Sequence, residues 1–138
     1  MKTNELARDY MARAKSRLNS ARAALDRKEY PDVVRYSQEC VELSLKASLR
    51  FVGVEYPREH DVSDVLTEVA GRFPKWFRER VEELAGISRN LAVLRGPSTY
   101  GEEERGVPPS KLFGVREASA ALTDAKNVFG LCSKLLVK

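Results

Sequence analysis

The stretch from Pro31 to Gly53, PDVVRYSQECVELSLKASLRFVG, has the broadest apolar helical pattern in the chain and decides the fold. Apolar and small residues recur along one side of it: Val34, Ser37, Val41, Leu45 and Phe51. A second set widens this surface: Val33, Cys40, Leu43, Ala47 and Leu49. A helix that is apolar over so much of its circumference needs packing partners on more than one side. We therefore expect it at the centre of a helical bundle.

Helical spacing also precedes and follows this stretch. Over residues 3–28, apolar positions step by three and four: Leu6, Tyr10, Ala14, Leu18, Ala21 and Leu25. A short helix is expected over 62–72, because Asp61 or Ser63 can cap free N–H groups of its first turn. Phe73-Pro74 then predicts a corner, since a residue before proline avoids the helical region.

The second half of the chain predicts two more long helices, over 74–95 and 115–136. Between them, residues 96–113 contain three glycines and three prolines, so we expect a long loop. The predicted fold class is all-α, an antiparallel up-and-down bundle of four main helices plus one short helix. The length of 138 residues suits a single domain over residues 1–138.

Composition limits the setting in which the protein works. Hydrophobic residues make up 43% of the chain, and no apolar run is long enough for a membrane span. The charged N-terminus lacks the apolar core of a signal peptide, so we expect a cytoplasmic protein. Charged residues reach 32% and Gln38 is the single glutamine, a composition that favours a thermophilic source.

The chemistry-bearing residues are few. Cys40 and Cys132 fall on apolar helix faces and are expected to be reduced core thiols. With His60 as the single histidine, neither a metal site nor a histidine-based catalytic triad is expected. Glycine-rich nucleotide-binding motifs are absent from the sequence, and we expect no cofactor.

Positive charge is concentrated in the first 28 residues. This part carries eight Lys and Arg against three Asp and Glu, whereas the whole chain has a net charge of +4. Arg8, Lys15 and Arg22 recur every seven residues and lie on one helix face. A solvated face explains this spacing, and a footprint for RNA or another polyanion is the alternative.

A candidate site follows from residues 88–104, SRNLAVLRGPSTYGEEE. On a helical wheel Arg95 lies on the apolar stripe, and Arg89 points away from it. Arg95 is expected either to bond the last free carbonyls of its helix or to bind phosphate. For Arg89 the main expectation is a surface or dimer-interface role.

The acidic run over 102–104 and the pair His60-Asp61 can each be explained by structure or by function. Glu102, Glu103 and Glu104 lie in a loop, where a solvated acidic run is expected. His60-Asp61 opens the short third helix, which predicts a capping and hydrogen-bonding role. The alternative is a catalytic or ligand-binding role, because a neutral imidazole can act as acid or base.

Several segments occur in an order that is informative as a set: Tyr30-Pro31-Asp32, YSQECVELSLKA over 36–47, His60-Asp61, the stretch from Arg95 to Tyr100-Gly101-Glu102, and an alanine-rich last helix. Over about residues 5–136 this pattern resembles the HEPN domain, a prokaryotic helical family that often partners nucleotidyltransferases. The resemblance implies a bundle that dimerises, with a groove between protomers. It also implies metal-independent RNA cleavage by an Arg followed, after four to six residues, by a His.

The chain departs from that family motif. Counted from Arg95, Tyr100 stands at the first histidine position, with Gly101 and Glu102 after it. Counted from Arg89, the three positions hold Leu94, Arg95 and Gly96. Tyrosine is a poor proton shuttle at neutral pH, because its ordinary pKa is about 10.

The resulting functional hypothesis is a largely non-enzymatic HEPN-like homodimer. It would bind a nucleotide, RNA or a nucleotidyltransferase partner through Arg95 and Tyr100, with further ligand contacts from Arg89, Asn90, Glu102 and His60. One alternative is a metal-independent ribonuclease of a toxin–antitoxin pair that uses Arg95 and Tyr100. Another is a structural partner subunit whose interface is its function.

Overall fold

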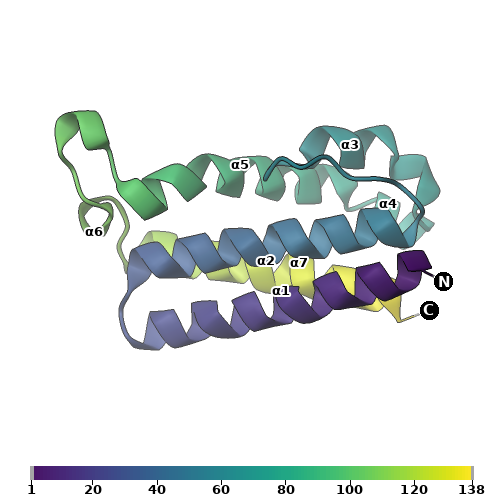
Figure 1. Ribbon diagram of the computed structural model, residues 1–138, viewed down its shortest axis with the longest axis horizontal. Helices are drawn as coiled ribbons and strands as arrows, with labels where there is room; N and C mark the ends of the chain where they lie inside the picture. Colours follow the sequence, from purple (N-terminus) through teal and green to yellow (C-terminus); the bar gives the residue numbers. More distant parts are fainter. Residues whose placement is uncertain (1, 138) are drawn as a thin grey trace.

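Four long helices build the protein (Figure 1): α1 (Lys2–Asp26), α2 (Tyr30–Phe51), α5 (Val81–Tyr100) and α7 (Val115–Leu136). The computed structural model describes residues 2–137. Short elements complete it: α3 (Ser63–Glu68), η1 (Ala70–Arg72), α4 (Lys75–Arg78), η2 (Glu103–Arg105) and α6 (Pro109–Leu112). Within residues 2–137 no strand forms, and each long helix reverses the direction of the one before it. The predicted all-α, up-and-down architecture is therefore confirmed.

Helix α2 lies at the centre of the bundle, as its broad apolar surface predicts. It packs against α1 and α7 on one side and against α5 on the other (Figure 1). Val33, Leu45 and Leu49 of this helix are fully buried. Neighbouring helices cover α2 on more than one side, and every one of its residues is buried or half-buried. A polar residue on α2 is consequently forced into a gap between two helices.

The predicted apolar face of α1 is confirmed for most of its length. Ala14, Leu18 and Ala21 are buried, and Tyr10 and Leu25 are partly buried against the core. Leu6 is exposed, and the prediction was wrong for this residue. The buried face is completed by Ala7, Met11 and Ala24, so it is centred slightly to one side of the predicted stripe.

The boundaries of the middle helices also differ from the prediction. The helix expected over 62–72 ends at Glu68 and is followed by the turn η1, and the helix expected over 74–95 breaks between Arg78 and Val81. The extended backbone of Phe73 confirms the corner before Pro74. The short α4 thereby turns Phe77 into the core, where its side chain is fully buried.

Helix α5 continues past Gly96 and Pro97, where a loop was expected. A proline near the end of a helix removes only one backbone hydrogen bond, so Pro97 is tolerated there. Gly101 ends the helix instead, with φ of 72°. A Cβ at this position would lie 2.1 Å from the Val107 carbonyl oxygen, so only glycine fits. The expected loop is therefore shorter, and it contains η2 and α6.

Both cysteines are free and buried, as expected for reduced core thiols. Burial raises the pKa of the Cys40 thiol and of the Cys132 thiol to about 12. These thiols are therefore protonated and unreactive at neutral pH. Within the described residues, no helix has the length and apolar content to cross a membrane.

Candidate functional site

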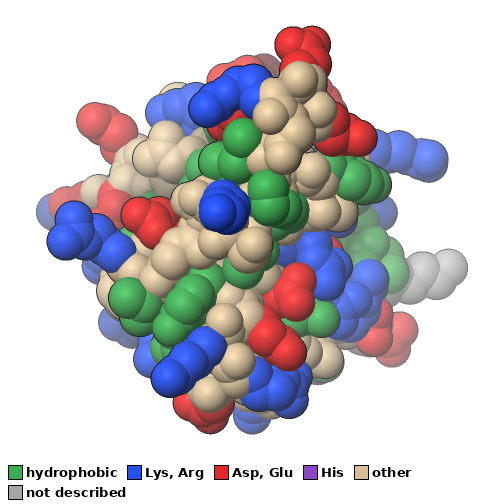
Figure 2. Space-filling model, turned by 90° about the vertical axis from the view of Figure 1, so that its left-hand side faces the viewer, with side chains coloured by type: hydrophobic (Ala, Val, Ile, Leu, Met, Phe, Trp, Pro, Cys, Tyr) green, Lys and Arg blue, Asp and Glu red, His purple; other side chains and the backbone are tan. Residues whose placement is uncertain are grey.

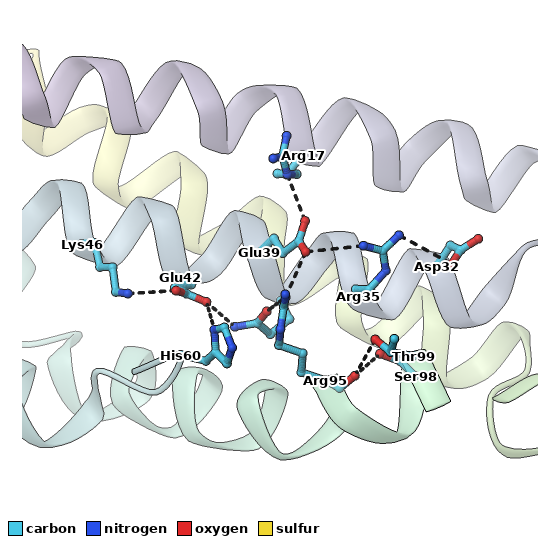
Figure 3. Close-up of polar contacts among 11 residues, drawn as sticks. Arg17, Asp32, Arg35, Glu39, Glu42, Lys46, His60, Arg95, Ser98 and Thr99 are labelled. Atoms are coloured by element: carbon cyan, nitrogen blue, oxygen red, sulfur yellow. Dashed lines mark hydrogen bonds and ion pairs between the residues drawn. The ribbon is translucent and has the colours of Figure 1, made fainter. Parts of the chain in front are cut away.

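Arg95 extends from α5 across the interhelical gap to α2 (Figure 3). Its Nη1 donates to Gln38 Oε1 at 2.8 Å and to Glu39 Oε2 at 2.9 Å. The expectation that Arg95 bonds the last carbonyls of its own helix is wrong, because α5 ends five residues later at Tyr100. The wheel prediction that Arg95 faces inward and Arg89 outward is confirmed: the Arg95 side chain is 29% exposed and reaches α2, whereas Arg89 lies on the exposed side of α5.

Glu39 collects three guanidinium groups from three helices. Besides Arg95, it accepts a hydrogen bond from Arg17 Nε of α1 at 2.9 Å. Arg35 Nη1, one turn earlier on α2, lies 3.6 Å from Glu39 Oε2. Arg35 Nη2 also lies 3.9 Å from Asp32 Oδ1, so two carboxylates face three guanidinium groups and this cluster retains a net positive charge.

A second carboxylate, Glu42, lies one turn further along α2. It accepts hydrogen bonds from Gln38 Nε2 at 3.0 Å and from Lys46 Nζ at 2.9 Å. His60 Nδ1 lies 2.8 Å from its Oε1. Burial raises the pKa of the Glu42 carboxyl, but the hydrogen bonds from Gln38, Lys46 and His60 outweigh burial and leave that pKa below its ordinary value. Glu42 is therefore ionised at neutral pH.

Gln38 joins the two carboxylate centres. The residue is 1% exposed, and its amide group gives N–H to Glu42 and accepts from Arg95. The reverse orientation would place the amide oxygen against a carboxylate and the amide nitrogen against a guanidinium, so the charges on each side determine the orientation. His60, Glu42, Gln38 and Arg95 thus form one continuous chain of hydrogen bonds.

The segment before α3 holds His60 in place. Asp61 Oδ1 accepts from the backbone N–H of Ser63 at 2.9 Å and from Ser88 Oγ at 3.1 Å. Ser88 Oγ in turn accepts from the backbone N–H of Val62 at 3.1 Å. Asp61 accepts from a free N–H of the first turn of α3, as predicted, but it lies one residue before the N-cap residue Val62, which makes no side-chain cap. His60 itself turns toward α2, because its neighbour is tied to α5.

An open hollow of about 460 Å³ lies beside this network, and we call it the Arg95 hollow. It is lined by Arg35, His60, Ala92, Arg95, Gly96, Thr99 and Tyr100. A smaller hollow of about 180 Å³ shares Arg95 and His60 with it and adds Arg13, Arg17, Glu39, Glu42 and Leu43. Together the two linings contain four arginines against two glutamates.

Three of the predicted site residues meet in one place, and the others lie elsewhere. Arg95, Tyr100 and His60 share the Arg95 hollow. Arg89 lines a different hollow, with Arg78 and residues of α3 and η1. Asn90 is exposed on α5, and Glu102 pairs with Arg105 beyond the helix end. Neither Asn90 nor Glu102 is part of the Arg95 hollow.

Charges of both signs are mixed on another part of the surface. Figure 2 shows the end of the molecule that carries α6, where Lys and Arg, Asp and Glu, and small groups of hydrophobic side chains are interspersed. Arg8, Lys15 and Arg22 are exposed on α1, which is consistent with the solvated helix face expected for them. The arginines around Glu39 differ because they converge from three elements on one gap.

Sequence reasoning missed the α2 residues that build this site: Arg35, Gln38, Glu39 and Glu42. A signal was present, since these polar residues interrupt a helix that is otherwise broadly apolar. Buried polar groups need partners, so a polar residue on a central helix predicts a partner on a facing helix. Periodicity alone could not name that partner.

Glu42→Gln is expected to lower the free energy of unfolding by about 1–3 kcal/mol at pH 7, because one amide oxygen cannot accept from three donors. The pKa of Glu42 in the folded protein lies below the ordinary value of 4.5. Its stabilising contribution is therefore complete above pH 4.5 and is lost as pH falls through that lowered pKa. In urea unfolding experiments, the free energy of unfolding should fall less between pH 7 and pH 3 in the variant than in the wild type. Glu59→Gln, an exposed carboxylate of the same segment, is the control, and equal acid profiles for Glu42→Gln and the wild type would contradict the prediction.

Comparison with known proteins places this geometry in a family. The model of the HEPN domain matches residues 7–135, almost the whole chain. The chain belongs to the HEPN domain family. A relative from Methanocaldococcus jannaschii, named "Putative toxin MJ1304", is 28% identical over 136 residues, which are 94% of this chain and 88% of that protein.

Two crystal structures share the HEPN fold seen here. TT1696 from Thermus thermophilus has a TM-score of 0.75 at 22% identity, over 93% of this chain and 96% of that one. ST0689, an archaeal HEPN homologue, has a TM-score of 0.72 at 23% identity, over 94% of this chain and 97% of that one. At such identities the likeness concerns the fold.

Proposed function

We propose that this HEPN-domain protein binds a phosphate-bearing ligand, a nucleotide or RNA, in the Arg95 hollow. The observation that carries the proposal is the arginine excess there, four arginines against two glutamates around two hollows that share Arg95 and His60. Arg95 commits only Nη1 to Gln38 and Glu39, and among the described residues neither Nε nor Nη2 donates a hydrogen bond. Guanidinium N–H groups are well shaped for phosphate oxygens.

The toxin name of the archaeal relative supports a role for this chain in a toxin–antitoxin pair.

A homodimer, and a nucleotidyltransferase as the partner protein, are parts of the same proposal. Val93 and Tyr100 lie on α5 with 70% and 67% of their surface exposed, which is a large exposure for an apolar and an aromatic side chain. Sedimentation of the isolated protein tests the dimer, and a stable monomer would contradict it.

Two titrations test the ligand proposal, one with a labelled single-stranded RNA and one with ATP as a mononucleotide. If the arginines neutralise three or four phosphates, the logarithm of the RNA association constant should fall against the logarithm of salt concentration with a slope of about −2 to −3. Fluorescence anisotropy at several salt concentrations measures this slope. A protein that binds neither RNA nor ATP at low salt would refute the proposal.

A second candidate function is metal-independent RNA cleavage. It is supported by His60 lying in the same hollow as Arg95 and Tyr100, although it comes from another segment. An imidazole can act as proton acceptor and donor near neutral pH. Incubation of single-stranded RNA with the protein in EDTA, followed by gel electrophoresis, tests it. Products that disappear with Arg95→Ala would favour cleavage, and intact RNA would reject it.

A further inference from the structure

His60 is held in one orientation by a partly buried, ionised partner, Glu42. Its Nδ1 lies 2.8 Å from Glu42 Oε1, and the other hydrogen bonds to Glu42 come from Gln38 and Lys46. An ionised carboxylate accepts hydrogen bonds and donates none, so Nδ1 must carry a proton. In the neutral ring the second nitrogen, Nε2, is then an acceptor.

The imidazole ring is accessible to a ligand although its orientation is restrained. The His60 side chain is 52% exposed, and it lines both the Arg95 hollow and the smaller hollow. Asp61 anchors the adjoining backbone to Ser63 and Ser88, and Glu42 anchors the ring. An anchored acceptor that faces an open hollow has little freedom to lose when a ligand binds.

His60 and Arg95 line the same two hollows. Arg95 is held by Gln38 and Glu39, and His60 is held by Glu42 about one turn further along α2 (Figure 3). One helical turn is about 5.4 Å, so the α2 residues that hold the two side chains are a short distance apart. A nucleotide whose phosphate binds Arg95 in this hollow can therefore present its ribose to His60.

We propose that His60 gives the Arg95 hollow a preference for ligands with a ribose 2′-hydroxyl, a proposal that rests on the phosphate-binding function above. Nε2 accepts the hydrogen bond that a 2′-hydroxyl donates. Deoxyribose has no such donor, and a 2′-O-methyl group has lost its proton. The 2′-hydroxyl is the group by which proteins distinguish RNA from DNA. A net hydrogen bond of this kind corresponds to roughly a three- to tenfold difference in affinity.

The protonation state of the ring can be measured directly, because His60 is the single histidine of the chain. In a two-bond ¹H–¹⁵N correlation spectrum of the neutral ring, the wild type should show a protonated Nδ1 and an unprotonated Nε2. The opposite tautomer would overturn the proposal, because Nε2 would then be a donor.

The binding experiment compares three versions of one labelled oligouridylate at pH 8: ribo, deoxy and 2′-O-methyl. For the wild type, the ribo version should bind roughly three- to tenfold more tightly than the other two. His60→Phe keeps an aromatic ring and removes the acceptor, so the ratio of ribo to deoxy affinity should fall to about one. Equal wild-type affinities for all three, or a preference that survives His60→Phe, would overturn the role of His60 and leave phosphate binding standing. Failure of the wild type to bind any of the three would overturn both.

Discussion

Arg95→Ala is expected to weaken RNA binding by about ten- to a hundredfold, the largest loss of any single substitution in this chain. The substitution removes the guanidinium that lines both hollows and that still has nitrogen donors for a ligand. Hydrogen bonds to charged groups contribute about 1.5–3 kcal/mol, which corresponds to this range of affinity. The slope of the logarithm of the association constant against the logarithm of salt concentration should also become less steep, by the contribution of about one phosphate contact.

The fold should survive this substitution, so the loss can be attributed to binding. Gln38 is 1% exposed and its amide oxygen would lose a partner, which is expected to lower the free energy of unfolding by about 1–2 kcal/mol. Circular dichroism should show unchanged helical content. Binding by Arg95→Ala equal to that of the wild type would remove the central support for the proposed site.

Arg89→Ala is the matched control for this experiment. It changes the net charge by the same amount on the same helix, but Arg89 lines a different hollow. We expect its RNA affinity to stay within about threefold of the wild type, because a distant exposed charge contributes only a screened attraction. A loss as large as that of Arg95→Ala would instead place the ligand across the outer face of α5.

The sequence was sufficient for features that depend on one helix at a time. The broad apolar surface of residues 31–53 predicted the central position of α2, and the helical wheel placed Arg95 inward. Both follow from periodicity, which a single segment contains in full. The partners of Arg95 could not be predicted in this way. They depend on how α5 lies against α2, which periodicity does not describe.

The wrong predictions have local physical causes. Gly96 and Pro97 were expected to end the fourth helix, yet the stop is Gly101, where the Val107 carbonyl approaches too closely for any Cβ. That contact joins residues on either side of η2 and has no signature in the helical pattern. Similarly, His60 was expected to help start a helix, but Glu42, 18 residues earlier, determines where its ring points.

Glu39→Gln is expected to act in the opposite direction and to tighten RNA binding by about tenfold. Glu39 is the shared acceptor of Arg17, Arg35 and Arg95 and therefore competes with a phosphate for their N–H groups. A charge pair at about 4 Å is worth up to about 4 kcal/mol near a protein surface, so release of part of this attraction explains a tenfold gain. The same change removes the carboxylate partner of Arg17 and Arg95, whereas Arg35 keeps Asp32, and it should lower the free energy of unfolding by about 1–3 kcal/mol. RNA should restore more thermal stability to this variant than to the wild type, because the ligand takes the place of the missing anion.

Glu83→Gln is the matched control for Glu39→Gln, since it makes the same chemical change in an exposed pair with Arg80. Anisotropy titrations and thermal unfolding with and without RNA compare the two variants. If both tighten binding equally, the gain comes from net charge and not from released arginines. If Glu39 only competed with the ligand, its removal could only strengthen binding. Weaker binding by Glu39→Gln, as by Arg95→Ala, would therefore contradict competition and mean that Glu39 positions the arginines for the ligand. A gain confined to Glu39→Gln means that an internal carboxylate occupies the phosphate site of the free protein, and binding then consists of exchanging that carboxylate for a ligand phosphate.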